Sequence, residues 1–125
     1  MPDLSQNLDL DLTLLKEIAD GSDEFVIESI GLFIEQTPES LQDISNAIAA
    51  RDWENAGANA HKIKSTLGFF GMLNCQALIQ QIESDCKGGM PNADEVIANF
   101  NQAQALIAIN TNALIAIKQD LQSKL

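Results

Sequence analysis

The sequence is poor in the residues from which metal centres and disulfide frameworks are built. It contains one histidine and two cysteines among 125 residues. A structural zinc site needs about four clustered ligands, so the composition argues against one. Cys75 and Cys86 lie on one expected helix, about 16 Å apart at roughly 1.5 Å per residue, which is too far for a disulfide. We expect both to be reduced residues of the core.

Long apolar runs and positive charge are also scarce. No uninterrupted apolar stretch reaches the roughly 20 residues that cross a bilayer. Acidic residues follow Met1-Pro2-Asp3 where a signal peptide would have a basic and then an apolar region. Seven basic against 18 acidic residues give a net charge of −11, which repels nucleic acid and anionic membranes. We therefore expect a soluble, cytoplasmic protein with neither nucleic acid nor membrane as a partner.

A glycine-rich phosphate loop of the P-loop type is missing too, and no ATP-binding module accompanies the helical segments. Asp9 and Asp11 have no convergent carboxylate partner, which argues against a hydrolase. The sequence is instead 46% hydrophobic, mainly Leu, Ile and Ala, with 5% aromatic residues. This composition favours packed helices over a β-sandwich, and the length fits one domain, residues 1–125, with one core.

Hydrophobic periodicity and turn residues predict five helical segments. Pro38 interrupts the second segment, where we expect a kink or a restart capped by Thr37. Asp52 is the expected cap of the third segment. Short connections between long helices predict an all-α protein, an antiparallel up-and-down four-helix bundle with a short additional N-terminal helix. The first segment runs over about 11–19, and the second is capped by Ser22 or Asp23 and runs to about Ala50. The third follows Asp52, and Gly68 and Gly71 loosen its end. The last two run over about 73–87 and 93–121.

The last segment has one polar residue in its apolar seam. Asn110 either fixes the register of the helix or lies where the helix leaves the core. The pentapeptide Ala-Leu-Ile-Ala-Ile occurs at 105–109 and again at 113–117. An offset of eight rotates by about 80°, so the copies widen the apolar face. Deep burial is the preferred explanation and self-association the alternative; we expect a monomer.

The only histidine, His61, falls on the flank of the third segment, off its apolar seam. Lys64 lies beside it, and Lys62 points about 100° away. A lone helical histidine is usually only solvated, but small neighbours let another macromolecule reach this one. A neutral, nucleophilic imidazole is available near pH 7. The seam contains Trp53, Ala56, Ala60, Ile63, Leu67 and Phe70, and the small neighbours are Gly57, Ala58, Ser65 and Gly68.

These residues carry a family resemblance. Ala60-His61-x-Ile63-Lys64-Ser65, with Gly71 ten residues after the histidine, resembles the Ala-His-x-Leu-Lys-Gly signature of histidine-containing phosphotransfer (HPt) domains of bacterial two-component phosphorelays. The chain departs from that pattern at Ser65, which replaces a glycine, and at Lys62, which adds a cation. The resemblance covers most of the chain, with further landmarks at Gly21, Asp23, Phe33, Thr37-Pro38, Leu41, Asp52, Leu78 and Ile82-Glu83.

The resemblance implies a phosphoryl carrier without kinase activity of its own. His61 would accept a phosphoryl group from an aspartyl phosphate on a receiver domain and pass it to another receiver aspartate. Lys64 would neutralise phosphoryl charge. The partners would be receiver domains of response regulators or hybrid sensor kinases, which bring their own Mg²⁺, so this chain needs no cofactor. Gly57, Ala58, Lys62, Ser65 and Gly68 would form the receiver-docking patch.

Two points stay open at the level of sequence. The family generally attacks through Nε2, and the group that orients Nδ1 could be Gln76, Gln80, Glu83 or water. The alternative function is a non-catalytic helical adaptor that docks receivers without being phosphorylated.

Overall fold

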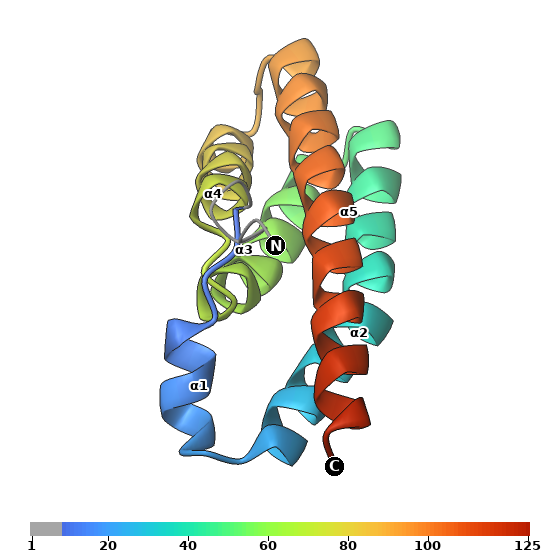
Figure 1. Cartoon of the computed structure of the whole chain (residues 1–125). Helices are drawn as coiled ribbons and strands as arrows, with labels where there is room; N and C mark the ends of the chain where they lie inside the picture. Colours follow the sequence, from blue (N-terminus) through green and yellow to red (C-terminus); the bar gives the residue numbers. More distant parts are fainter. Residues whose placement is uncertain (1–8) are drawn as a thin grey trace.

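The structure is a computed structural model that describes residues 9–125, and within that range every regular element is an α-helix. Four long helices form an antiparallel bundle, and short α1 lies at the end where α2 begins and α5 finishes (Figure 1). The predicted fold class is confirmed, and the predicted helix limits agree closely. The helices are α1 (Thr13–Ala19), α2 (Asp23–Ala49), α3 (Trp53–Phe69), α4 (Leu73–Lys87) and α5 (Ala93–Ser123).

The order of the helices around the bundle decides which surfaces are far apart. Helix α3 packs against α2 and α4, and α5 packs against the same two helices. Helices α3 and α5 are therefore diagonal partners across the core, with α5 in front of α3 in Figure 1. An outward-facing residue of α3 and an outward-facing residue of α5 lie on opposite sides of the molecule.

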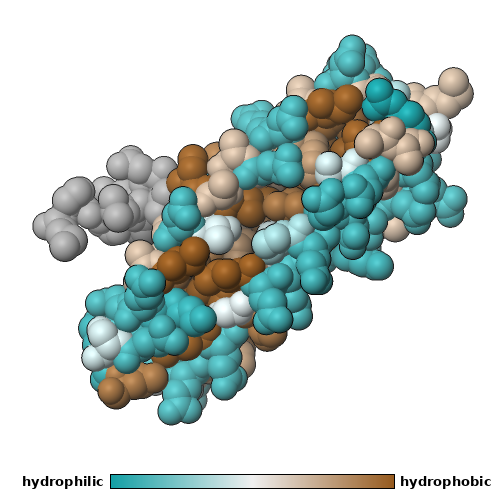
Figure 2. Space-filling model, turned by 90° about the vertical axis from the view of Figure 1, so that its right-hand side faces the viewer, coloured by the Kyte–Doolittle hydropathy of each residue, from teal (hydrophilic) through white to brown (hydrophobic). Residues whose placement is uncertain are grey.

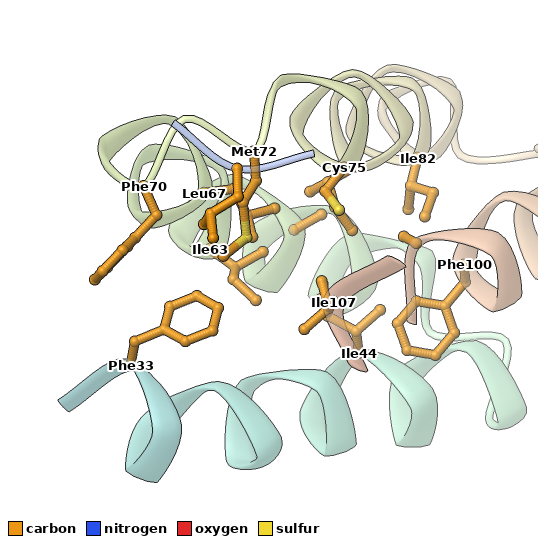
Figure 3. Close-up of a cluster of buried hydrophobic side chains, with 14 of the residues drawn as sticks. Phe33, Ile44, Ile63, Leu67, Phe70, Met72, Cys75, Ile82, Phe100 and Ile107 are labelled. Atoms are coloured by element: carbon orange, nitrogen blue, oxygen red, sulfur yellow. The ribbon is translucent and has the colours of Figure 1, made fainter. Parts of the chain in front are cut away.

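The core is filled mainly by aliphatic side chains from all four long helices. Phe33 of α2 points toward Ile63 and Leu67 of α3, and Ile44 of α2 lies beside Ile107 of α5 (Figure 3). Phe33 also packs on Phe70, with ring centroids 4.9 Å apart. Both cysteines are free and buried, as predicted, and burial raises their thiol pKa values.

Polar residues before the helices stabilise three of the long ones. The Ser22 hydroxyl accepts a hydrogen bond from the Phe25 amide at 3.1 Å. The Asp52 carboxylate accepts from the Asn55 amide at 3.3 Å, which confirms the predicted cap of α3. Asn92 caps α5 in the same way. Each cap satisfies backbone donors that the first helical turn leaves unpaired.

Helix α2 runs without interruption through Pro38. The predicted restart capped by Thr37 is therefore wrong, because Thr37 lies buried inside the same helix. Proline costs the helix one backbone hydrogen bond. Burial of the apolar face on both sides of Pro38, from Val26 to Ile48, outweighs that loss.

Helix α4 has no side-chain cap of its own and receives one from the start of the chain. The two carboxylate oxygens of Asp9 accept hydrogen bonds from the amides of Asn74, at 2.8 Å, and Cys75, at 2.7 Å. Asn110 Nδ2 donates to the Asp9 carbonyl oxygen at 3.0 Å. Asn110 is 1% exposed, so the prediction that it lies where α5 leaves the core is wrong. It holds the N-terminal segment instead.

The repeated pentapeptides of α5 do widen its apolar face. Ile107 and Leu114 are buried, and Leu106 and Ile117 are partly buried against the core, whereas Ile109 stays exposed. Seen from the right of Figure 1, the bundle surface carries hydrophobic patches bordered by hydrophilic side chains (Figure 2). Across residues 9–125, no helix has both the length and the apolar character needed to cross a membrane.

Candidate functional site

His61 stands on the outer flank of α3, where the sequence predicted it. A different side of this helix faces the core. Its buried residues are Ala56, Ala60, Ile63 and Leu67. The His61 side chain is 69% exposed. A ring in this position is reachable from solvent.

Glu83 of α4 holds one nitrogen of this ring. Its Oε2 lies 2.8 Å from His61 Nδ1, and its side chain is only 5% exposed. A carboxylate can only accept hydrogen bonds, so Nδ1 must carry the proton in this contact. In the neutral ring the free electron pair then lies on Nε2. Of the sequence candidates for orienting Nδ1, the structure selects Glu83.

The second oxygen of the same carboxylate pairs with Lys64. Lys64 Nζ lies 2.6 Å from Glu83 Oε1 and donates a further hydrogen bond to Gln80 Oε1 at 2.7 Å. The Lys64 side chain is 25% exposed. One buried carboxylate thus connects His61 and Lys64, which lie one turn apart on α3.

This arrangement keeps Glu83 ionised. The hydrogen bond from Lys64 holds the pKa of Glu83 below its ordinary value of 4.5, and the contact with His61 acts in the same direction. Burial alone would raise that pKa, because it disfavours the charged form. The paired donors outweigh burial, so Glu83 is a carboxylate near neutral pH.

Two glycines of α3 leave room for side chains of α4 beside these contacts. A Cβ atom at Gly57 would lie 3.1 Å from Cys86 Cβ. A Cβ atom at Gly68 would lie 2.6 Å from Nε2 of Gln76. Gln76 uses that nitrogen to donate to the Lys64 carbonyl oxygen at 3.1 Å. Gly57 and Gly68 thus face α4 and are half-buried.

The five residues of the predicted docking patch therefore fall into two groups. Ala58, Lys62 and Ser65 are exposed beside His61, whereas the two glycines lie at the contact between α3 and α4. Exposed small side chains leave the approach to the ring open on one flank. The glycines lie beneath the site, where they leave room for the side chains of Cys86 and Gln76.

Cys86 and Lys87 lie near the site and were not among the predicted site residues. Together with His61 and Glu83 they line one surface cavity. The sequence pattern that could have indicated Lys87 is its helical spacing. It shares one face of α4 with Gln76, Gln80 and Glu83. Within residues 9–125, no cluster of three or more His, Cys, Asp or Glu side chains has a geometry suited to a metal ion.

The chain is similar to known proteins in sequence and in fold. A family model described as Hpt domain matches residues 28–122. The chain is similar to the phosphorelay intermediate protein rdeA of Dictyostelium discoideum, with 27% identity over 77 residues. That match covers 62% of this chain but 30% of the relative, so the chain spans about a third of the relative's length.

A solved structure has the same fold. It is the crystal structure of the HPT domain from a sensor hybrid histidine kinase of Shewanella, which superposes with a TM-score of 0.74. The match covers 90% of this chain and 95% of that one at 19% sequence identity. It therefore supports the helical arrangement described above.

Proposed function

The chain belongs to the Hpt domain family, and on this premise we propose that it is a phosphorelay intermediate in which His61 carries the phosphoryl group. The observation that carries the proposal is the contact between Glu83 and His61 Nδ1, which leaves Nε2 of an exposed ring with its free electron pair. Such a nitrogen is a nucleophile of suitable strength at neutral pH.

The proposed transfer begins with Nε2 attacking the phosphorus of a receiver's aspartyl phosphate in line with the leaving carboxylate. The N–P bond forms as the P–O bond to aspartate breaks, and the aspartate leaves as a carboxylate. The proton on Nδ1 stays in place, and the charge of Glu83 stabilises the positive charge that develops on the ring. In the reverse step, the carboxylate of a second receiver attacks the phosphohistidine.

Lys64 is the proposed partner of the phosphoryl oxygens. An ammonium group has three donors, and the contacts to Glu83 and Gln80 use two of them. The third donor is available for a phosphoryl oxygen one turn along α3. The anchored ammonium thus supplies positive charge without a large movement of the side chain.

Receivers are proposed to dock over Ala58, Lys62 and Ser65, the exposed residues around the ring. The small side chains of Ala58 and Ser65 permit the close approach that in-line attack needs. We expect the receiver to bring the Mg²⁺ that transfer requires, with no cofactor held by this chain.

The test is incubation with a phosphorylated receiver domain. We expect label on this chain that is lost in acid and retained in alkali, as for a phosphoramidate bond. His61→Ala should abolish the label and leave the helical circular dichroism unchanged, because the side chain is exposed. Label on the His61→Ala protein would refute the assignment. Docking of receivers without any label would instead support the adaptor alternative.

A further inference from the structure

Gln80 of α4 is an exposed glutamine with a hydrogen bond at each end of its amide group. Its Oε1 accepts from Lys64 Nζ of α3 at 2.7 Å. Its Nε2 donates to the Ser84 hydroxyl, one turn along α4, at 3.1 Å. Because an ammonium group has donors only, the amide oxygen must face Lys64. The glutamine is therefore held in one orientation across the contact between the two helices.

The next residue on the helix shows that this arrangement is particular to Gln80. Gln81 is also exposed, and its Nε2 donates to Asp85 Oδ1, one turn along α4, at 2.8 Å. Within the part of the chain that the structure describes, the Gln81 side chain makes no hydrogen bond to α3. The two glutamines thus share a bond within α4, and only Gln80 adds a bond to the lysine of the site.

Two acceptors from α4 fix the position of the Lys64 ammonium group. Glu83 Oε1 lies 2.6 Å from Nζ, and Gln80 Oε1 lies 2.7 Å from it. Their positions are three residues apart, so both side chains lie on one face of α4. With a single acceptor the ammonium group would pivot about that contact, because a lysine side chain is flexible. Two acceptors occupy two of its three tetrahedral donors and leave one direction for the third.

Glu83 is poorly suited to fix the ammonium group alone. Its other oxygen already holds His61 Nδ1 at 2.8 Å, so the carboxylate serves two partners. Gln80 supplies a second acceptor that carries no charge. A carboxylate in its place would add negative charge beside the phosphoryl oxygens and offset the charge of Lys64. A neutral amide therefore fixes the lysine without weakening its attraction for phosphate.

We propose that Gln80 is a positioning residue, whose amide oxygen fixes the Lys64 ammonium so that its third donor meets a phosphoryl oxygen on His61 Nε2. This inference rests on the proposed function, because it requires Lys64 to act on that group. Gln80 acts through Lys64 alone. Its contribution is pre-organisation, since the donor is in place before the phosphoryl group arrives.

The test compares two glutamine variants. Gln80→Met removes the amide and keeps a long side chain of good helix propensity. We expect it to slow labelling of His61 by phosphoramidate about fivefold, the effect of one hydrogen bond, with unchanged circular dichroism. Phosphoramidate is the probe because a small donor reacts without receiver docking. Gln81→Met is the matched control and should react at the parent rate. A parent rate for Gln80→Met, or equal losses in both variants, would overturn the inference.

A double-mutant cycle separates positioning from a merely structural role. Gln80→Met should slow labelling in the parent protein and have no effect when Lys64 is already alanine. The same loss in both backgrounds would overturn the inference, because Gln80 would then act independently of the lysine. Nitrogen NMR of labelled histidine should show the Nδ1–H tautomer retained in Gln80→Met, since Glu83 still holds the ring. A mixture of tautomers would overturn the assignment to Lys64.

The parent protein separates the two levels of failure. If neither phosphoramidate nor any phosphorylated receiver labels His61 in the parent, the proposed function is wrong and this inference falls with it. If the parent is labelled and Gln80→Met matches it, only the positioning role of Gln80 is lost.

Discussion

Glu83 Oε2 lies 2.8 Å from His61 Nδ1, and this contact joins a buried carboxylate on α4 to an exposed ring on α3. The same carboxylate pairs with Lys64 through its other oxygen at 2.6 Å. The tautomer of the ring, the position of the ammonium group and the contact between the two helices thus depend on one side chain. The predictions below begin with that residue.

Glu83→Ala should slow phosphoryl transfer to His61 about 30-fold, or about 2 kcal/mol of barrier. The ring would lose the acceptor that keeps the proton on Nδ1. Nitrogen NMR of labelled histidine should show the Nδ1–H tautomer dominant in the parent protein and a mixture in the variant. An unchanged tautomer ratio together with an unchanged rate would contradict the orienting role.

The lowered pKa of Glu83 predicts a pH-dependent contribution to stability. Because its folded-state pKa lies below the ordinary value of 4.5, this contribution is fully present above about pH 4.5 and is lost as pH falls through the lowered pKa. Urea denaturation should therefore show parent and Glu83→Gln proteins converging in free energy of unfolding at acid pH. Glu28→Gln removes an exposed carboxylate and controls for net charge. A constant difference down to acid pH would contradict the pairing.

Lys64→Ala should slow transfer about tenfold, equivalent to roughly 1.4 kcal/mol of barrier. The reason is loss of an ammonium group held one turn from the reacting nitrogen. Labelling by phosphoramidate should slow as well, because Lys64 acts on the phosphoryl group rather than on docking. Lys62→Ala is the matched control, and its rate with phosphoramidate should equal that of the parent. If both lysine variants behave alike, Lys64 has no special role.

Ser65→Trp should block transfer from a receiver while preserving the helical content. Ser65 is exposed one turn from His61, so an indole there would obstruct the approach of a protein surface. Phosphoramidate should still label His61 in this variant. Transfer from the receiver at the parent rate would show that the open flank is incidental.

Gly71→Ala should destabilise the fold by at least about 2 kcal/mol, through backbone strain and a clash. Its φ is +67°, and an added Cβ would collide with the backbone of Asp11, whose amide donates to the Phe70 carbonyl at 3.1 Å. Gly21→Ala is the control, since Gly21 also has a positive φ, +86°, but open space around it. Thermal unfolding should show the larger loss at Gly71. Equal losses would mean that strain alone matters and that the N-terminal contact does not.

Local rules account for most of what could be predicted from the sequence. Capping side chains such as Asp52 and apolar spacing such as that of Ala56, Ala60, Ile63 and Leu67 act within a few residues, so they are readable without coordinates. Pro38 shows the limit of such rules. A proline ordinarily ends a helix, but burial of the apolar face along α2 outweighs that effect, and the helix continues.

The predicted docking patch shows a second limit. Spacing along α3 placed Gly57 and Gly68 on the same side as His61, as the structure also has them. Spacing along a helix does not tell which adjacent helix covers a given face. Here residues of α4 cover both glycines. Their role beneath the site became visible only once the adjacent helix was in place.

By itself, the sequence determined that the chain would form a helical bundle with one accessible histidine, because helix period, caps and small neighbours act locally. Only the tertiary structure decided that Glu83, rather than Gln76 or Gln80, meets the ring. It also decided that Asn110 would hold the Asp9 carbonyl oxygen at 3.0 Å. The physical reason is the register between antiparallel helices, which follows from how the whole core packs and from no short stretch of the chain.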